Sequence, residues 1–262
     1  MSEGLTLKKF EEASEIVKKA TQETKLIYSE YFSERYGNKI YFKPENMQRT
    51  GAYKVRGAYY KMSQLSEEEK KRGVIACSAG NHAQGVALAA TKNGIKSLIC
   101  LPDGAPISKV EATKSYGAEV CMVKGVYDDA YNKAVALQKE HNYTFVHPFD
   151  NENVIAGQGT IGLEILEDVP NVTDVVVPLG GGGLGAGVAL AIKTFKPEVR
   201  VIGAIPEGSP AWKNSLAAGR VVAADQVRTS AEGVAVKRPG DLTFALLNEF
   251  LDDLVTVTER DI

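Results

Sequence analysis

Residues 174–195 read DVVVPLGGGGLGAGVALAIKTF, and this stretch decides the fold. A β-branched run is followed by four glycines, residues 180–183, and then by small and apolar residues in a helical pattern. Strand, glycine turn and helix in this order are typical of α/β proteins, in which helices cover a parallel sheet. Four successive glycines lose too much backbone entropy for a routine turn. Their N–H groups, together with the start of the helix, are suited to bind a phosphate.

Two other interpretations of these glycines stay open. The first is a tight turn between strand and helix that holds no ligand. The second is the dinucleotide fingerprint, which Gly180, Gly182 and Gly185 satisfy, with Glu207 near the end of the next strand. A dinucleotide-binding oxidoreductase is therefore an alternative class, although it leaves two further motifs of the chain without a role.

The alternation of apolar strands and amphipathic helices extends outward from this stretch. Further strands are expected within residues 73–80, 96–102, 118–125, 143–148 and 198–206. A segment rich in Pro, Asp, Asn and Gly, residues 147–160, marks a break before a new helix. We predict an α/β fold of two lobes, each an open, mostly parallel twisted sheet flanked by helices.

Composition excludes several classes of function. The 262 residues are 44% hydrophobic and 24% charged, with a net charge of -2 and a pI of about 6.0, so no global basic field attracts nucleic acid or a membrane. Cys77, Cys100 and Cys121 lie in apolar contexts without CxxC spacing, which predicts reduced core thiols. The N-terminus has no apolar signal-peptide core, and no window reaches membrane-spanning length. We expect a soluble, cytoplasmic protein.

The second motif is SAGNHAQGVA, residues 78–87, where an expected strand gives way to a helix. Backbone N–H groups there and the Ser78 hydroxyl suit a carboxylate, and the Asn81 amide is able to donate to a phenolic oxygen. A plain helix cap explains Ser and Asn equally well. For His82 we expect a structural role rather than that of a ligand or base.

The third motif is RTGAYKVRGA, residues 49–58. Burial near cationic or apolar groups lowers the pKa of a lysine, so that the neutral Lys54 amine can attack a carbonyl and form a Schiff base. Arg49 and Arg56 flank it, and Tyr53 is able to pack against a flat ring. The alternative is an exposed lysine at a helix start. Together, a phosphate loop, a carboxylate-binding helix start and an activatable lysine indicate a pyridoxal phosphate enzyme that acts on an amino acid.

With TSAEGVAVKRPGD at residues 229–241, four motifs stand in an order and spacing that resemble one family. The chain resembles the threonine dehydratase and serine racemase group of pyridoxal phosphate enzymes, fold type II or tryptophan synthase beta-like, from residue 5 to residue 262. The resemblance implies a large cofactor-binding domain of residues 1–52 and 150–262, and a small substrate-carboxylate domain of residues 53–149. By analogy it also implies a homo-oligomer.

The resemblance also implies roles for individual residues. Lys54 is implied to carry the cofactor as a Schiff base and to act as acid and base. The implied cofactor-binding residues are Tyr53, Lys54, Asn81, Gly180, Gly181, Gly182, Gly183, Leu184 and Glu232. The implied residues around the substrate carboxylate are Ser78, Ala79, Gly80, Asn81 and His82. The implied reaction is the PLP-dependent deamination of L-threonine to 2-oxobutanoate and ammonia, with L-serine as a further substrate.

Three departures from the family pattern qualify this expectation. Ala79 stands where racemases carry a second serine, so we expect negligible D-serine formation. Ile205 and Ala211 stand where racemase-like members place metal-binding carboxylates, so no metal site is predicted. The chain also stops before the glycine-rich loop whose serine faces the pyridine nitrogen in the family. Serine racemase, serine dehydratase and a non-catalytic pyridoxal phosphate-binding protein therefore remain as alternatives.

Overall fold

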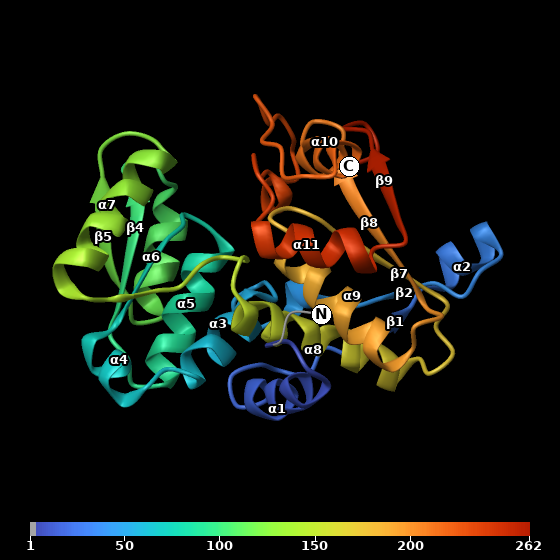
Figure 1. Cartoon of the computed structure of the whole chain (residues 1–262), viewed down its shortest axis with the longest axis horizontal. Coiled ribbons are helices and arrows are strands. Elements are labelled where there is room, and N and C mark those ends of the chain that lie inside the picture. The colour runs from blue at the N-terminus through green and yellow to red at the C-terminus, as the bar shows by residue number, and fades with distance from the viewer. Residues whose placement is uncertain (1–3) are drawn as a thin grey trace.

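The computed structural model describes residues 4–262 and contains two parallel sheets that lie in separate halves of the molecule (Figure 1). A third, antiparallel pair of two-residue strands is joined to the second half, at the edge of the molecule. The α/β class and the parallel sheets predicted from the sequence are confirmed. The domain boundaries at residues 52/53 and 149/150 stay a prediction.

The first sheet has four parallel strands in the order β5-β4-β3-β6. Its strands are β3 (Val74–Cys77), β4 (Ser97–Pro102), β5 (Glu119–Val123) and β6 (Thr144–Phe145). The helices that follow the first three of these strands are α5 (Asn81–Lys92), α6 (Ile107–Ser115) and α7 (Tyr127–His141). Strand β3 is buried along its whole length, as a central strand covered on both faces must be.

The second sheet has three parallel strands in the order β7-β8-β9. These strands are β7 (Asp174–Pro178), β8 (Arg200–Pro206) and β9 (Asp253–Val257). Its helices are α8 (Glu152–Asp168), α9 (Gly183–Phe195), α10 (Ala211–Ala218) and α11 (Asp241–Phe250). The largest apolar cluster, which includes Trp212 and Leu247, lies among these elements and reaches α1 (Leu7–Val17).

The N-terminal part supplies the helix that carries Lys54. It contains β1 (Ile27–Tyr28), α2 (Glu30–Tyr36), β2 (Tyr41–Phe42), the 3₁₀ helix η1 (Glu45–Met47), α3 (Lys54–Ser63) and α4 (Glu67–Arg72). A second 3₁₀ helix, η2 (Glu232–Val234), precedes α11. Helix α3 crosses α8 where two glycines meet, since a Cβ on Gly157 would lie 2.6 Å from the Gly57 Cα.

Local sequence signals account for several helix ends. The capping box of Ser66 and Glu69 is present at the start of α4. Gly94 follows α5 with a φ of +66°, a conformation that favours glycine after a helix. Asn151 caps α8 through its side chain, at the break expected from the sequence. None of the helices within residues 4–262 has the length and apolarity to cross a membrane.

Candidate active site

The two predicted binding loops each begin at the carboxyl end of a parallel strand. Residues 78–80 follow β3, and the glycine loop of residues 179–182 follows β7. This end of a parallel sheet is where α/β proteins place their ligands, because the N-termini of the following helices also point there. The segment of residues 146–150 runs between the two loops and connects the first sheet to α8.

Lys54 is the first residue of α3, and its side chain is half-buried. Its Nζ donates to the Pro148 carbonyl oxygen at 2.8 Å and lies 5.4 Å from the centre of the Tyr53 ring. Burial lowers the pKa of the Lys54 amine to about 8. The amine is therefore partly neutral near physiological pH, which is the property that a nucleophilic or basic lysine needs. Burial raises the pKa of Tyr53 to about 12, so this phenol stays neutral.

Arg56 does not act on the Lys54 amine as the sequence suggested. Its side chain is fully buried and forms bidentate hydrogen bonds with two carboxylates, Glu45 at 2.9 and 2.8 Å and Glu164 at 2.5 and 2.9 Å. Lys43 also contacts Glu164, at 2.6 Å. This network joins η1, α3 and α8, so Arg56 anchors the first turn of the helix that Lys54 begins.

Helix α5 packs directly on the backbone of Lys54, because a Cβ on Gly85 would lie 3.0 Å from the Lys54 carbonyl carbon. In the loop before α5, the Ser78 hydroxyl accepts a hydrogen bond from the Gly80 N–H at 3.1 Å. Ala79 and Gly80 are half-buried, and Asn81 is exposed at the helix start. The loop therefore presents backbone N–H groups and one amide at a positive helix end, a donor set that suits a carboxylate.

His82 is buried, and its Nε2 lies 2.9 Å from the Val146 carbonyl oxygen, to which it donates. Burial, with a smaller contribution from Lys54, lowers the pKa of His82 to about 3. Because the neutral imidazole donates to this backbone carbonyl, it ties α5 to the segment of residues 146–150. This arrangement agrees with the structural role expected for His82.

The glycine loop has a donor surface with no protein partner. Within residues 4–262, the backbone N–H groups of residues 180–185 make no hydrogen bond, although most of this stretch is buried. Gly182 has a φ of +99°, which other residues rarely adopt. Unpaired N–H groups at the start of α9 fit an anion such as a phosphate, because buried donors require an acceptor. Leu184 follows in the first turn of α9 and is half-buried.

Phe149 connects the glycine loop to Lys54. A Cβ on Gly181 would lie 2.2 Å from the Phe149 ring, and a Cβ on Gly183 would lie 2.8 Å from its Cβ. The preceding residue, Pro148, accepts the hydrogen bond from Lys54. The structure thus brings the lysine, the helix α5 and the glycine loop together around one short segment.

Glu232 lies differently from the other predicted cofactor residues. Its carboxylate is 80% exposed and forms an ion pair of 2.9 Å with Lys109 of α6. The bond to Lys109 lowers the pKa of Glu232. The contact joins η2 to a helix of the first sheet, and the predicted position at a cofactor ring edge stays a prediction.

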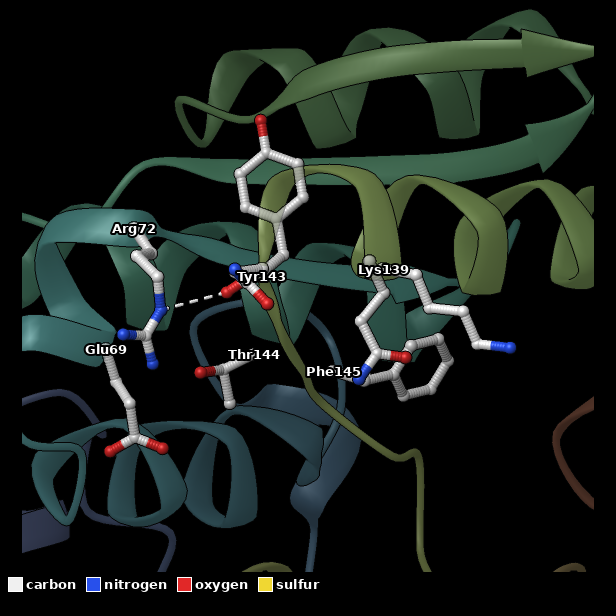
Figure 2. A pocket seen from close by; sticks show the side chains of 8 residues that line it. Glu69, Arg72, Lys139, Tyr143, Thr144 and Phe145 are labelled. Carbon is white, nitrogen blue, oxygen red and sulfur yellow. Dashed lines mark hydrogen bonds between the residues drawn. The ribbon is translucent and has the colours of Figure 1, made fainter.

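Two surface hollows differ in their position relative to the predicted site. The larger, about 460 Å³, lies at the edge strand β6, where Figure 2 shows Glu69, Arg72 and Thr144 around it, and no predicted site residue lines it. The smaller, about 280 Å³, lies beside the connecting segment, and His147, Phe149 and Arg238 contribute to its wall. Only the smaller hollow therefore adjoins the chemistry expected from the sequence.

Several site residues were missed by sequence reasoning. Pro148, Phe149, Asp150, Trp212 and Thr243 contact the glycine loop, Lys54 or α11, but none belongs to a recognisable binding motif. Only tertiary contact reveals them. Within residues 4–262 no group of three or more His, Cys, Asp or Glu side chains is arranged to hold a metal ion. The three cysteines are free, and they occupy adjacent register positions on β3, β4 and β5.

The chain is similar to known proteins over most of its length. Residues 17–262 match the family described as pyridoxal-phosphate dependent enzymes. The chain is 51% identical over 258 residues to an L-threonine ammonia-lyase of Thermotoga maritima, covering 98% of this chain and 64% of that protein. It thus spans less than two thirds of that relative's length.

Solved structures agree with the sequence comparison. A threonine deaminase from Solanum lycopersicum superposes with a TM-score of 0.94 at 38% identity, covering 98% of this chain and 75% of that one. A serine racemase from maize gives a TM-score of 0.95 at 35% identity, covering 98% and 78%. Both similarities extend over nearly the whole chain.

Proposed function

Because the chain belongs to the family of pyridoxal-phosphate dependent enzymes, we propose that it converts L-threonine to 2-oxobutanoate and ammonia by α,β-elimination of water, and that it also acts on L-serine. One observation carries the proposal. The Lys54 amine, whose pKa is lowered to about 8 by burial, donates to the segment of residues 146–150, and the same segment contacts the glycine loop with its unpaired N–H groups. The identity to threonine ammonia-lyases supports threonine as the substrate.

The residues present fit this cofactor. When bound, pyridoxal 5′-phosphate supplies an electron sink that stabilises negative charge at the substrate α-carbon. In our proposal the N–H groups of residues 180–185 hold the phosphate, Asn81 donates to the phenolic oxygen, and the Lys54 Nζ holds the group covalently. Tyr53, which contacts the Lys54 amine, is proposed to pack beside the ring.

The chain's own groups then move the substrate proton. The start of α5, residues 78–82, is proposed to bind the substrate carboxylate and to orient the α-carbon. Once the substrate amine has replaced it on the cofactor, the Lys54 Nζ would take the proton from that carbon, since its lowered pKa leaves part of the amine unprotonated near pH 7. The β-hydroxyl would leave with a proton as water, and a water molecule would then hydrolyse the resulting enamine to the 2-oxo acid and ammonia. Ala79 has no hydroxyl or ionisable group that could return a proton to the opposite face, which favours elimination over racemisation.

A cofactor-loading experiment tests the proposal. Pyridoxal 5′-phosphate is added to the purified chain, which is then dialysed, and the retained yellow absorption is compared with that of Lys54→Ala and of Lys61→Ala, a control in the same helix. We expect the wild type and Lys61→Ala to keep the colour and to form 2-oxobutanoate from threonine. We expect Lys54→Ala to lose the colour and to form product at least about 100-fold more slowly.

Other results would identify the alternatives. Retained colour without release of ammonia would mean a protein that binds the cofactor without catalysis. A D-serine yield from L-serine comparable with the pyruvate yield would mean a racemase. Equal colour in Lys54→Ala and the wild type would contradict the assignment of the lysine.

We also propose that the protein works in the cytoplasm as a homo-oligomer. The free thiols of Cys77, Cys100 and Cys121 support a reducing compartment. Sedimentation velocity of the loaded protein tests the oligomeric state, and a monomer at micromolar concentration would contradict it.

A further inference from the structure

The carbonyl oxygens of three residues of the glycine loop, Gly180, Gly181 and Gly182, each accept a hydrogen bond from the protein. The Gly180 oxygen accepts from the Trp212 Nε1 at 2.6 Å. The Gly181 oxygen accepts from the Thr243 Oγ1 at 2.7 Å and from the Gly240 N–H at 3.2 Å. The Gly182 oxygen accepts from the Ala186 N–H at 2.8 Å.

The peptide geometry links these bonds to the donor surface of the loop. In a planar trans peptide, the carbonyl and the N–H of the next residue point in opposite directions. Holding the Gly180 oxygen on Trp212 therefore turns the Gly181 N–H away from Trp212. Holding the Gly181 oxygen on Thr243 does the same for the Gly182 N–H. These are the N–H groups that have no partner within residues 4–262.

Without such bonds, the loop has little to fix its peptides. Glycine lacks a Cβ and populates a wide range of φ and ψ, so four in a row can rotate at low cost. The Trp212 and Thr243 side chains are, in contrast, almost fully buried at 1% and 0% exposure. Trp212 packs on Phe244, and the Thr243 N–H donates to Asp150 at 3.0 Å. The two donors are thus held by α10 and α11, independently of the loop.

We propose that Trp212 and Thr243 are positioning residues that pre-organise the phosphate-binding N–H groups of the glycine loop. This inference rests on the proposed binding of pyridoxal 5′-phosphate. In this proposal neither side chain binds the phosphate itself. Each acts by fixing a carbonyl, so that the opposed N–H is aimed before the phosphate arrives.

A purely structural role makes a different prediction. If the two side chains only stabilised the fold, replacing them would weaken every ligand of the site to the same degree. If they orient the N–H groups, affinity is lost mainly for ligands that carry a phosphate. Pyridoxal has the same aldehyde and ring as pyridoxal 5′-phosphate but lacks the phosphate, so the ratio of the two dissociation constants isolates the effect.

The dissociation constants of both compounds are measured by absorption titration of the 262-residue chain and of Thr243→Val, Thr243→Ser and Trp212→Phe. We expect Thr243→Val to weaken pyridoxal 5′-phosphate about 3- to 10-fold, because the Gly181 oxygen keeps the Gly240 N–H. Trp212→Phe leaves the Gly180 oxygen with no other donor within residues 4–262, and we expect it to weaken pyridoxal 5′-phosphate binding about 5- to 50-fold. The dissociation constant of pyridoxal should change by less than about twofold in these variants. Thr243→Ser should retain the wild-type ratio of the two dissociation constants.

Equal weakening of the two compounds in Thr243→Val and Trp212→Phe would overturn the inference while leaving the proposed cofactor intact. A wild-type chain that binds neither compound would overturn the proposed function, and this inference with it. If Trp212→Phe fails to fold, the matched pair Thr243→Val and Thr243→Ser decides the question, because the two substitutions differ in the hydroxyl group that donates to Gly181.

Discussion

At the scale of the residue, the Lys54 amine combines a hydrogen bond with a lowered pKa. It donates to a backbone carbonyl, and burial alone lowers its pKa to about 8. The cationic neighbours suggested by the sequence are not the cause. Arg56 is neutralised by Glu45 and Glu164, on the far side of the first helical turn. Desolvation therefore explains the activation, and desolvation is not visible in a linear pattern.

The lowered pKa predicts how cofactor attachment depends on pH. Only the neutral amine attacks an aldehyde, and a lysine is neutral above its pKa. The rate at which colour develops should therefore rise with pH and reach half its maximum near pH 8. Free Nα-acetyl-lysine, with a pKa of about 10.4, serves as the control and should still gain rate above pH 9. A protein midpoint near 10 would show that Lys54 is not desolvated.

At the scale of the element, helix α3 is held by its neighbours from both sides. The glycine crossing with α8 brings the two backbones into contact, and the Arg56 network ties the same turn to η1. Buried arginine needs all of these acceptors, because an unpaired charge in the interior is costly. The position of Lys54 at the start of α3 is thereby set by residues that do not belong to its motif.

Replacing Arg56 by Met should be strongly destabilising. It leaves Glu45 without its cation and Glu164 with Lys43 as its remaining cation, and we expect the free energy of unfolding to fall by about 3–5 kcal/mol. Urea denaturation measures this. Arg200→Met is the control, since Arg200 pairs with Asp174 at 3.1 Å on the surface, where a pair contributes about 0–1 kcal/mol. Losses of equal size would contradict the role of the buried network.

At the scale of the whole molecule, the segment of residues 146–150 connects the two halves and lies at the site. His82 holds its beginning, Lys54 contacts its middle, and Asp150 holds its end. The Asp150 carboxylate accepts from the Asp241 and Thr243 N–H groups at 3.0 Å each, at the start of α11. One short connection therefore couples the first sheet to the helix that holds the glycine loop.

Asp150→Ala should weaken this coupling. It leaves two N–H groups in the first turn of α11 unpaired, which costs about 0.5–2 kcal/mol for a lost helix cap. We also expect weaker retention of pyridoxal 5′-phosphate, because Thr243 lies in the same turn. Asp103→Ala, in an exposed loop of the first half, is the control for urea denaturation and dialysis. Unchanged stability in Asp150→Ala would rule out the coupling.

Local patterns in the sequence determine the fold class and the motifs of the site. Alternating strands and helices predicted two parallel sheets, and the motifs around Ser78 and Gly180 lie between a strand end and a helix start as expected. These features depend on neighbours within a few residues, which the linear sequence displays. The tertiary structure alone decided what holds them: Phe149 and Trp212 against the glycine loop, and Asp150 on α11. Such partners lie tens of residues away in the chain, and burial brings them together without any local signal.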